Sequence, residues 1–206
     1  NWHVHADAGL RVVDDAKLLI GGAPSRVIRL SEAGAKAVAG WFAGEPVGES
    51  TVARVLARRL LDAGMVHPKL GHWGQIPPSE VGVTVVIPVK DEPAGLERLL
   101  AALPDVPVVV VDDGSATPVV AENATVIRRE QAGGPGVARM VGLASVETDF
   151  VAFIDADVEP GPNFLTDLIG HFADSAVVAV APRVRSRVGS SVIERYEADF
   201  SPLDLG

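Results

Sequence analysis

The sequence contains no cysteine, few aromatic residues and no long apolar run. Without cysteine, the chain can form no disulfide bond, no thiolate metal site and no cysteine nucleophile. Its richest apolar stretches, near residues 106–111 and 176–181, have the length of a strand and are too short to span a membrane.

The first residues also lack the basic patch and apolar segment of a signal peptide. We therefore expect a cytoplasmic protein. The lack of an initiator methionine indicates a trimmed or partial chain, and leaves open a membrane anchor in residues not present here.

The charge of the chain is acidic and unevenly distributed. Its 206 residues are 48% hydrophobic, which is ample for a packed core, and carry a formal net charge of −9. Up to Ser79 there are nine basic and seven acidic residues, whereas from Glu80 onward there are nine basic and 20 acidic residues. An acidic protein is a poor binder of a phosphate backbone, so we expect no nucleic-acid partner. The change in charge predicts two units with different roles.

A segment rich in glycine and proline separates these two units. Its Pro77-Pro78 pair fixes two φ angles and removes two backbone donors, so no helix interior or central strand passes through it. The sequence therefore predicts a small module in residues 1–70, a linker in residues 71–80 and a second domain in residues 81–206.

The first unit is predicted to be a small winged-helix-like α+β module. Residues 10–19 and 25–30 have the pattern of two short strands, and Ser31 precedes an alanine-rich helix that runs towards Phe42. A second helix is expected over residues 51–63, stopped by Gly64. DNA binding through the arginines of this second helix is one interpretation of the module (Arg54, Arg58 and Arg59). We favour a solvated helix face, because the module is nearly neutral.

The second unit alternates strands with helices. Strands are predicted at residues 81–88, 106–111, 125–128, 150–154 and 177–181, and helices at residues 94–103, 136–146 and 163–172. This alternation predicts an α/β fold with a Rossmann-like, mostly parallel sheet. Ligands of such sheets bind at the carboxyl ends of the strands.

Acidic residues follow three of the predicted strands, at the ends where ligands are expected. Asp155 and Asp157 come directly after the strand at 150–154 and are separated by one small residue, a pattern that favours Mg²⁺ or Mn²⁺ bridging protein and diphosphate. The alternative is a turn-forming pair of aspartates. Asp112 and Asp113 follow the second strand, where one carboxylate could accept a hydrogen bond from a base or a ribose hydroxyl. The alternative there is a tight Asp-Gly turn.

A glycine-rich loop at residues 131–136 leads into the helix that contains Arg139. Free backbone N–H groups at such a helix start attract phosphate, but an Arg139 that pairs with a surface acid is an equal alternative. The five histidines show no partner pattern, and we interpret His3 and His5 as part of a frayed terminus.

Four motifs of the second unit, in this order and spacing, resemble family 2 glycosyltransferases of the GT-A fold. They are Val85-Val86-Ile87-Pro88-Val89-Lys90-Asp91-Glu92, Val109-Val110-Val111-Asp112-Asp113-Gly114-Ser115, Gly136-Val137-Ala138-Arg139 and Phe153-Ile154-Asp155-Ala156-Asp157. The first unit is similar to the small winged-helix peptide-recognition modules of peptide-maturation pathways.

This resemblance implies a metal-dependent, inverting transferase that moves glucose from UDP-glucose to the hydroxyl of a small-molecule, peptide-derived or glycan acceptor. It assigns the nucleotide-sugar to Pro88, Val89, Glu92, Asp113, Gln131, Arg139, Asp155 and Ala156, and the metal to Asp155 and Asp157. It also implies a protein or peptide partner for the first module.

The sequence departs from the family pattern at three places. The usual Tyr-Asn-Glu reads Lys90-Asp91-Glu92, and Met140 follows Arg139 where asparagine is common. The family takes its catalytic base from an acidic pair downstream of Asp-X-Asp, and no convincing match is found among Glu194, Glu197, Asp199 and Asp204. We therefore expect the base beyond Gly206, much of the acceptor half to be missing, and this fragment to be inactive alone.

Two other functions compete with a glycosyltransferase. In the first, the N-terminal module is the working part of a peptide- or partner-binding protein and the sheet is a scaffold. In the second, the chain is a nucleotidyltransferase. The second is disfavoured because no glycine-rich triphosphate loop with Arg or Lys follows the first strand of the sheet.

Overall fold

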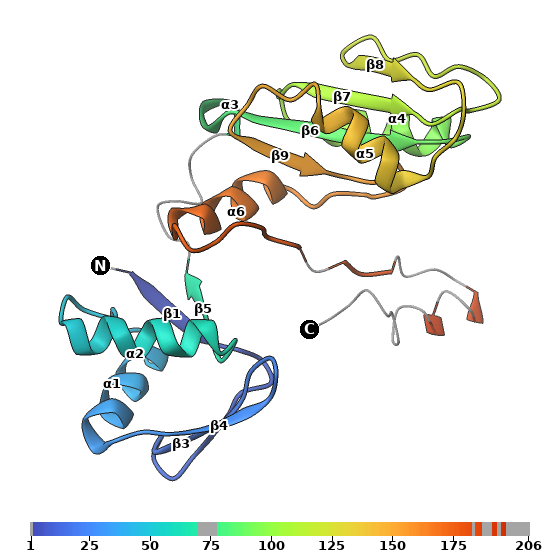
Figure 1. Cartoon of the computed structure of the whole chain (residues 1–206). Helices are drawn as coiled ribbons and strands as arrows, with labels where there is room; N and C mark the ends of the chain where they lie inside the picture. The colour runs from blue at the N-terminus through green and yellow to red at the C-terminus, as the bar shows by residue number, and fades with distance from the viewer. Residues whose placement is uncertain (1, 70–77, 183, 187–190, 193–194, 197–206) are drawn as a thin grey trace. The chain divides into compact units, whose positions relative to one another are not determined.

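The computed structural model describes residues 2–69, 78–182, 184–186, 191–192 and 195–196 (Figure 1). It contains two compact units, one centred on residues 2–69 and the other on residues 78–173. Most of the predicted linker and the four acidic candidates for a catalytic base (Glu194, Glu197, Asp199 and Asp204) lie outside the described residues. Within the described residues, no helix is long and apolar enough to cross a membrane.

The first unit contains two small antiparallel sheets. Strands β2 (Arg11–Val13), β3 (Leu18–Gly21) and β4 (Arg26–Arg29) form one sheet in that order, and β1 (His3–Ala6) pairs with β5 (Val66–Lys69) in the other. The prediction of one strand over residues 10–19 is wrong, because residues 14–16 all have positive φ angles and form a turn inside it. The prediction of a frayed terminus is also wrong, since β1 pairs with β5, from His3 opposite Lys69 to Ala6 opposite Val66, a partner too distant in sequence for local patterns to indicate.

Both predicted helices of the first unit are confirmed. Helix α1 (Glu32–Phe42) begins after Ser31, whose hydroxyl accepts a hydrogen bond from the Gly34 N–H, and α2 (Thr51–Asp62) begins after Ser50 in the same way. Their apolar faces pack with the sheets around a core that includes Val4, Leu19, Val38, Trp41, Leu60 and Met65. The comparison with a winged helix stays a prediction.

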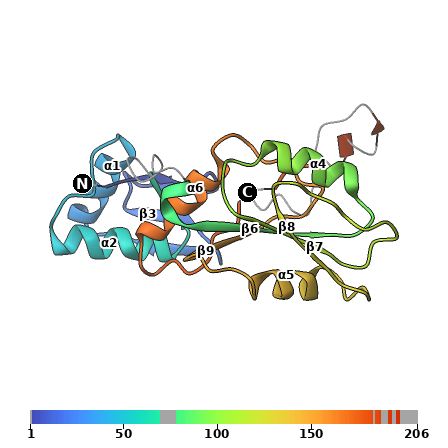
Figure 2. The same cartoon turned by 90° about the horizontal axis from the view of Figure 1, so that it is seen from above.

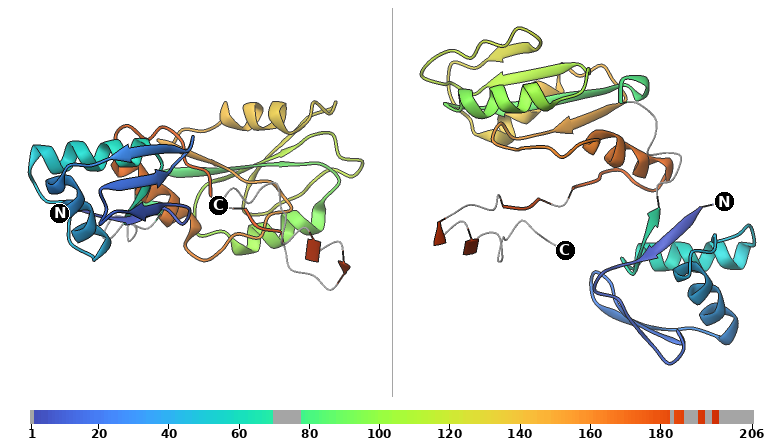
Figure 3. Two further views of the ribbon diagram at one scale, coloured as in Figure 1. Left: turned by 90° about the horizontal axis from the view of Figure 1, so that it is seen from below. Right: turned by 180° about the vertical axis from the view of Figure 1, so that it is seen from behind.

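The second unit is a parallel sheet with helices on both faces. Its strand order is β8 (Thr125–Arg128), β7 (Val108–Asp112), β6 (Val83–Val89) and β9 (Phe150–Phe153). Helices α4 (Pro93–Ala102) and α5 (Pro135–Leu143) cover opposite faces of it (Figures 2 and 3). A short helix α3 (Pro78–Val81) precedes the sheet, and α6 (Phe164–Gly170) with a final 3₁₀ turn (His171–Ala173) follows it. The predicted alternation of strands and helices is thus confirmed up to residue 173.

The apolar runs of β6 and β7 explain their central position. All seven residues of β6 and all five of β7 are buried, as expected for strands covered on both faces. Alternate side chains serve alternate faces: Val85 and Ile87 pack in one cluster with Leu96 of α4, whereas Val86 packs in another with Ala138 of α5. This two-sided burial holds the carboxyl ends of the strands in register.

The predicted strand at residues 177–181 is wrong. These residues have no regular secondary structure, and Val178 is 90% exposed. An apolar β-branched run becomes a strand only when a neighbouring strand accepts its hydrogen bonds, and none of the described residues does so here.

Candidate functional site

The predicted site residues stand at one edge of the second unit's sheet. Strands β7 and β9 both pair in parallel with β6, with Pro88 opposite Val111, Val89 opposite Asp112, and Val86 opposite Phe153. Their carboxyl ends therefore point the same way, and the acidic segments that follow them emerge at the same edge. The sheet topology thus brings together three motifs that lie up to 70 residues apart in sequence.

The end of β6 contacts both neighbouring strand ends. Pro88 and Val89 are buried, and the Val89 carbonyl accepts a hydrogen bond of 2.9 Å from the Asp113 N–H. Glu92 caps α4 by accepting a hydrogen bond from the Gly95 N–H. A Cβ atom placed on Gly95 would lie 2.7 Å from the carbonyl oxygen of Ala156, so the chain after β9 runs directly against the start of α4.

Asp112 is fully buried and forms the turn that follows β7. Its carboxylate accepts hydrogen bonds from the N–H groups of Ser115 (2.9 Å) and Val119 (3.1 Å), and pairs with Arg128 at the end of β8. Burial opposes its ionisation, but these donors outweigh burial and hold the pKa of Asp112 below its ordinary value. The turn interpretation therefore describes Asp112 well, and its oxygens are occupied by the protein.

Asp113 binds the glycine-rich loop. Its carboxylate accepts hydrogen bonds from the N–H groups of Gly133 (3.0 Å) and Gly134 (2.7 Å) and pairs with Arg129. Burial again opposes ionisation, and the two backbone donors with Arg129 lower the pKa of Asp113. The N–H groups of Gly133 and Gly134 belong to the loop that was predicted to bind phosphate. In the structure they donate to the Asp113 carboxylate instead. The contact between Asp113 and a nucleotide base stays a prediction, and would require a base N–H to replace one of these donors.

Arg139 connects α5 to the acidic pair after β9. It emerges from the helix that begins directly after Gly134 and forms an ion pair with Asp155. Of the two roles predicted for Arg139, phosphate binding and pairing with an acid, the structure shows the second. The acid is Asp155, which belongs to the predicted metal site. Asp157 is exposed, Ala156 is buried, and Gln131 is exposed in the loop before α5. No hydrogen bond or ion pair among the described residues joins Asp113 directly to Asp155 or Asp157.

Asp155 and Asp157 have the chemistry to hold a hard divalent cation together with a diphosphate. No group of three or more His, Asp or Glu residues that could hold a metal occurs among the described residues. Mg²⁺ and Mn²⁺ sites of transferases often use only one or two carboxylates, with phosphate oxygens and water as the other ligands. The carboxylates of Asp155 and Asp157, which lie on either side of Ala156, fit this pattern. Arg139 would then lie beside the same anion.

The cations that hold the two buried aspartates were missed by sequence reasoning. Arg128 is the last residue of β8 and Arg129 follows it directly, and they reach Asp112 and Asp113 respectively. The matching pairs, Asp112-Asp113 and Arg128-Arg129 at the ends of neighbouring strands, were a signal that could have identified them.

The prediction that the histidines have no partner pattern is wrong for His5 and His67. His67 contacts the Asp7 carboxylate at 2.9 Å, and its ring lies 5.5 Å from that of His5. Burial and repulsion from His67 lower the pKa of His5. These residues belong to the β1–β5 pair of the first unit and lie outside the candidate site.

A cavity of the second unit lies beside the predicted site rather than over the acidic pair. It has a volume of about 860 Å³ and is bounded by the start of α4 and by residues 115–123 after β7. Of the residues assigned to the nucleotide-sugar, only Glu92 lines it. The acidic pair is open to solvent, since Asp157 is exposed and Asp155 is half exposed.

Known proteins resemble the chain over both units. The sequence profile of glycosyl transferase family 2 matches residues 84–203. A pre-mycofactocin glycosyltransferase from Mycobacterium tuberculosis is 42% identical over 98% of this chain and 43% of the relative. The succinoglycan biosynthesis protein ExoW from Rhizobium meliloti is 44% identical over 40% of this chain and 31% of the relative. The chain therefore spans less than half the length of these relatives.

The family profile covers more than half of the chain and all of the strand ends that carry the site, and the parallel four-stranded sheet fits the GT-A fold. The chain belongs to glycosyltransferase family 2.

Proposed function

We propose that the second unit binds the nucleotide-sugar donor of a metal-dependent, inverting glycosyltransferase, and that the donor is UDP-glucose. The observation that carries the proposal is the series of contacts that joins the strand ends. Asp113 holds Gly133 and Gly134, these lead into α5, and Arg139 of α5 pairs with Asp155. A cationic side chain is thereby held against Asp155, at the sheet edge from which Asp157 also emerges, and this suits a diphosphate bound with a divalent cation.

In this proposal the chain's own residues bind and orient the donor. Pro88, Val89 and Asp113 line the nucleoside side, and Glu92 and Gln131 lie at its margins. Asp155 and Asp157 hold the cation, which when bound would neutralise the charge that develops on the departing diphosphate. Arg139 supplies a positive charge to the same group. The acceptor hydroxyl attacks the anomeric carbon from the side opposite the diphosphate, and this inverts the configuration. We assign no general base among the described residues.

The acceptor is proposed from the relatives. The name of the Mycobacterium tuberculosis relative supports pre-mycofactocin, or the glucan growing on it, as the molecule that receives the sugar. The aligned region covers the N-terminal module as well as the sheet, which supports the same acceptor more than a generic polysaccharide.

Calorimetry with UDP tests the donor site. We expect UDP to bind the full chain in the presence of Mn²⁺ and to bind much more weakly after EDTA treatment. The double variant Asp155→Ala/Asp157→Ala should bind UDP equally weakly with and without Mn²⁺. Asp149→Ala is the matched control, because Asp149 is an exposed aspartate just before the opposite end of β9. Equal binding of UDP by the double variant and the parent chain would exclude this site.

A second function is favoured by a groove in the first unit. It has a volume of about 560 Å³ and lies along α1 and α2, with Leu30, Ala37 and Leu56 in its wall and Val52 and Val55 strongly exposed beside them. Two exposed arginines, Arg29 and Arg59, line the groove, and none of the described residues that line it is acidic. An apolar floor with cationic edges complements a peptide that carries apolar and acidic side chains. We propose that the module binds such a peptide in a maturation pathway.

Fluorescence anisotropy on the full chain separates the two functions. A short labelled peptide of alternating Glu and Leu should bind the parent chain, and the variant Arg29→Glu/Arg59→Glu should lose this binding while it keeps UDP binding. Arg11→Glu on exposed strand β2 is the control. If a Lys-Leu peptide binds equally well, or the control loses as much affinity as the double variant, the groove is not the binding site.

A further inference from the structure

Asp91 stands at the end of β6 in a conformation that few residue types tolerate. Its φ angle is +54°, in the left-handed region, where aspartate and asparagine are accepted more readily than other residues with side chains. It follows the buried Val89 by two residues and precedes Glu92, the cap of α4. None of the roles proposed above uses Asp91, although residues on both sides of it are assigned to the donor.

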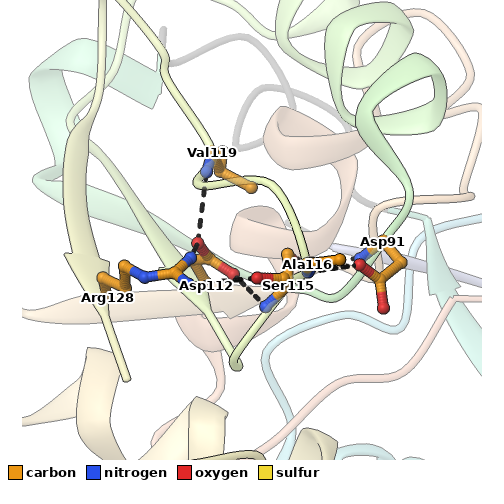
Figure 4. A network of polar contacts seen from close by, with 6 residues as sticks. All are labelled: Asp91, Asp112, Ser115, Ala116, Val119 and Arg128. Atoms are coloured by element: carbon orange, nitrogen blue, oxygen red, sulfur yellow. Dashed lines mark hydrogen bonds and ion pairs between the residues drawn. The ribbon is translucent and has the colours of Figure 1, made fainter. Parts of the chain in front are cut away.

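Both the backbone and the side chain of Asp91 bind the loop that follows β7 (Figure 4). The Asp91 N–H donates to the Ser115 hydroxyl oxygen at 3.0 Å. In return, the Asp91 carboxylate accepts a hydrogen bond of 2.7 Å from the Ala116 N–H. One residue after β6 is therefore bonded twice to consecutive residues after β7. The left-handed backbone at Asp91 turns both groups towards that loop.

Ser115 passes this connection on to two more strands. Its N–H donates to the buried carboxylate of Asp112, which also binds the Val119 N–H and Arg128 of β8. Arg128 donates in addition to the Ser115 carbonyl at 3.0 Å. Asp112 and Ser115 are buried and Asp91 is exposed, and a hydrogen-bonded network with such a buried centre holds loops in a single arrangement. The ends of β6, β7 and β8 are thus joined through Ser115, and Asp91 is the contribution of β6.

The geometry points to Asp91 as a positioning residue, which fixes the loop after β7, and with it Asp113, against Pro88 and Val89 without touching the donor. This inference rests on the proposed donor site. The position of Asp113 in the chain supports this role, because Asp112 and Ser115 on either side of it both belong to the network. The Asp113 N–H also donates a hydrogen bond to the Val89 carbonyl. The role needs an acceptor oxygen and a left-handed backbone at position 91, and it needs no negative charge.

Two substitutions separate this role from a charged one. Asp91→Asn keeps the acceptor oxygen and tolerates the positive φ angle, whereas Asp91→Gly keeps the backbone conformation and removes the acceptor. We expect Asp91→Gly to raise amide hydrogen exchange at residues 115–119 and to weaken UDP binding, each by about fivefold, the value of one hydrogen bond. Asp91→Asn should remain within about twofold of the parent chain in both measurements. Asp105→Gly, at an exposed aspartate before β7, is the control.

Each outcome decides between the alternatives. If Asp91→Asn binds UDP as weakly as Asp91→Gly while its hydrogen exchange matches the parent chain, the Asp91 charge acts directly on the ligand and the positioning role is overturned. Unchanged exchange at residues 115–119 in Asp91→Gly also overturns it. Should the parent chain bind no UDP, the proposed donor site fails, and the exchange measurement still decides whether Asp91 holds the loop.

Discussion

The two units place their charges in different environments. In the first unit, ion pairs such as Arg58–Asp62 and Lys17–Glu32 lie on the surface, where at least two-fifths of each side chain is exposed. In the second unit, Asp112 at the end of β7 and Asp113 directly after it have side chains only 0% and 5% exposed and pair with Arg128 and Arg129. Exposed pairs contribute little to stability, whereas a buried charge that loses its partner is strongly destabilising.

This difference implies that, in the second unit, the residues that stabilise the fold also form the candidate donor site. In the first unit, the residues of the core and those of the groove are different. The groups that hold the second sheet's loops are the same groups that shape the candidate donor site. In the first unit, the core around Val38, Trp41 and Leu60 is apolar, and the arginines that line its groove lie outside this core. Four measurements can break or sharpen this contrast.

Acid should affect the second unit most strongly. The folded pKa values of Asp112 and Asp113 lie below the ordinary carboxyl value, so their contribution is complete above about pH 5 and is lost as the pH falls through those lowered values. Hydrogen exchange by mass spectrometry, corrected for intrinsic rates, should show peptides of residues 83–143 losing protection at a higher pH than peptides of residues 32–62. The contrast fails if both units lose protection at one common pH.

Removal of a single buried carboxylate should have the next largest effect. Asp113→Ala leaves Arg129 and the N–H groups of Gly133 and Gly134 without their partner, which should cost about 3–5 kcal/mol. Urea denaturation followed by hydrogen exchange should assign this loss to the second unit. Asp149→Ala, at an exposed position of the same unit, should change stability by less than about 0.5 kcal/mol. Equal losses of stability in the two variants would show that the buried contacts of Asp113 do not hold the loop.

The packing of α5 on the sheet should be the next most sensitive feature. A Cβ atom on Gly142 would lie 2.4 Å from the Val86 Cγ1 atom and 3.1 Å from the Val111 Cγ2 atom, so Gly142→Ala should cost about 1–3 kcal/mol. Gly136 lies on the same helix with no atom near its virtual Cβ, and Gly136→Ala should be neutral or stabilise by up to about 1 kcal/mol. Thermal unfolding of the two variants distinguishes overpacking from helix propensity. If both variants raise the melting temperature, or both lower it by the same amount, this explanation is refuted.

The smallest effect is expected at a helix cap of the first unit. Ser50→Ala removes the oxygen that accepts the Ala53 N–H at the start of α2, a loss of about 1 kcal/mol. Ser25→Ala, at an exposed turn position, is the control. Because the second unit shares none of these contacts, UDP binding should not change. A change in UDP affinity with Ser50→Ala would show that the two units are energetically coupled.

The sequence predicted best those features that depend on short-range patterns. The strand Thr125–Arg128 has the predicted bounds, and the caps at Ser31 and Gly64 follow from local chemistry that needs no distant partner. The apolar runs of β6 and β7 likewise predicted burial on both faces, because no other environment suits so many consecutive valines. In these elements local preference and tertiary packing agree.

Features that depend on distant partners were missed. The strand β1 exists because β5 pairs with it, and residues 177–181 form no strand because no described neighbour pairs with them. In the candidate site, the aspartates themselves were predicted, but their partners were not. The donors to Asp113 come from residues 129–134, whose approach depends on the crossover between β8 and α5. Sequence patterns identify which groups carry charge, whereas the fold decides which donors satisfy them.

The close approach at Gly95 has a consequence for any mutational survey of this chain. Every side chain at that position would press on the backbone of Ala156 and on Glu92, and would shift the aspartates on either side of Ala156. Saturation mutagenesis scored by UDP binding would therefore rank position 95 with the proposed metal ligands Asp155 and Asp157, although Gly95 has no side chain to offer a ligand. Intolerance to replacement at this position would report steric crowding between two chain segments, and should not be taken as a sign of chemistry.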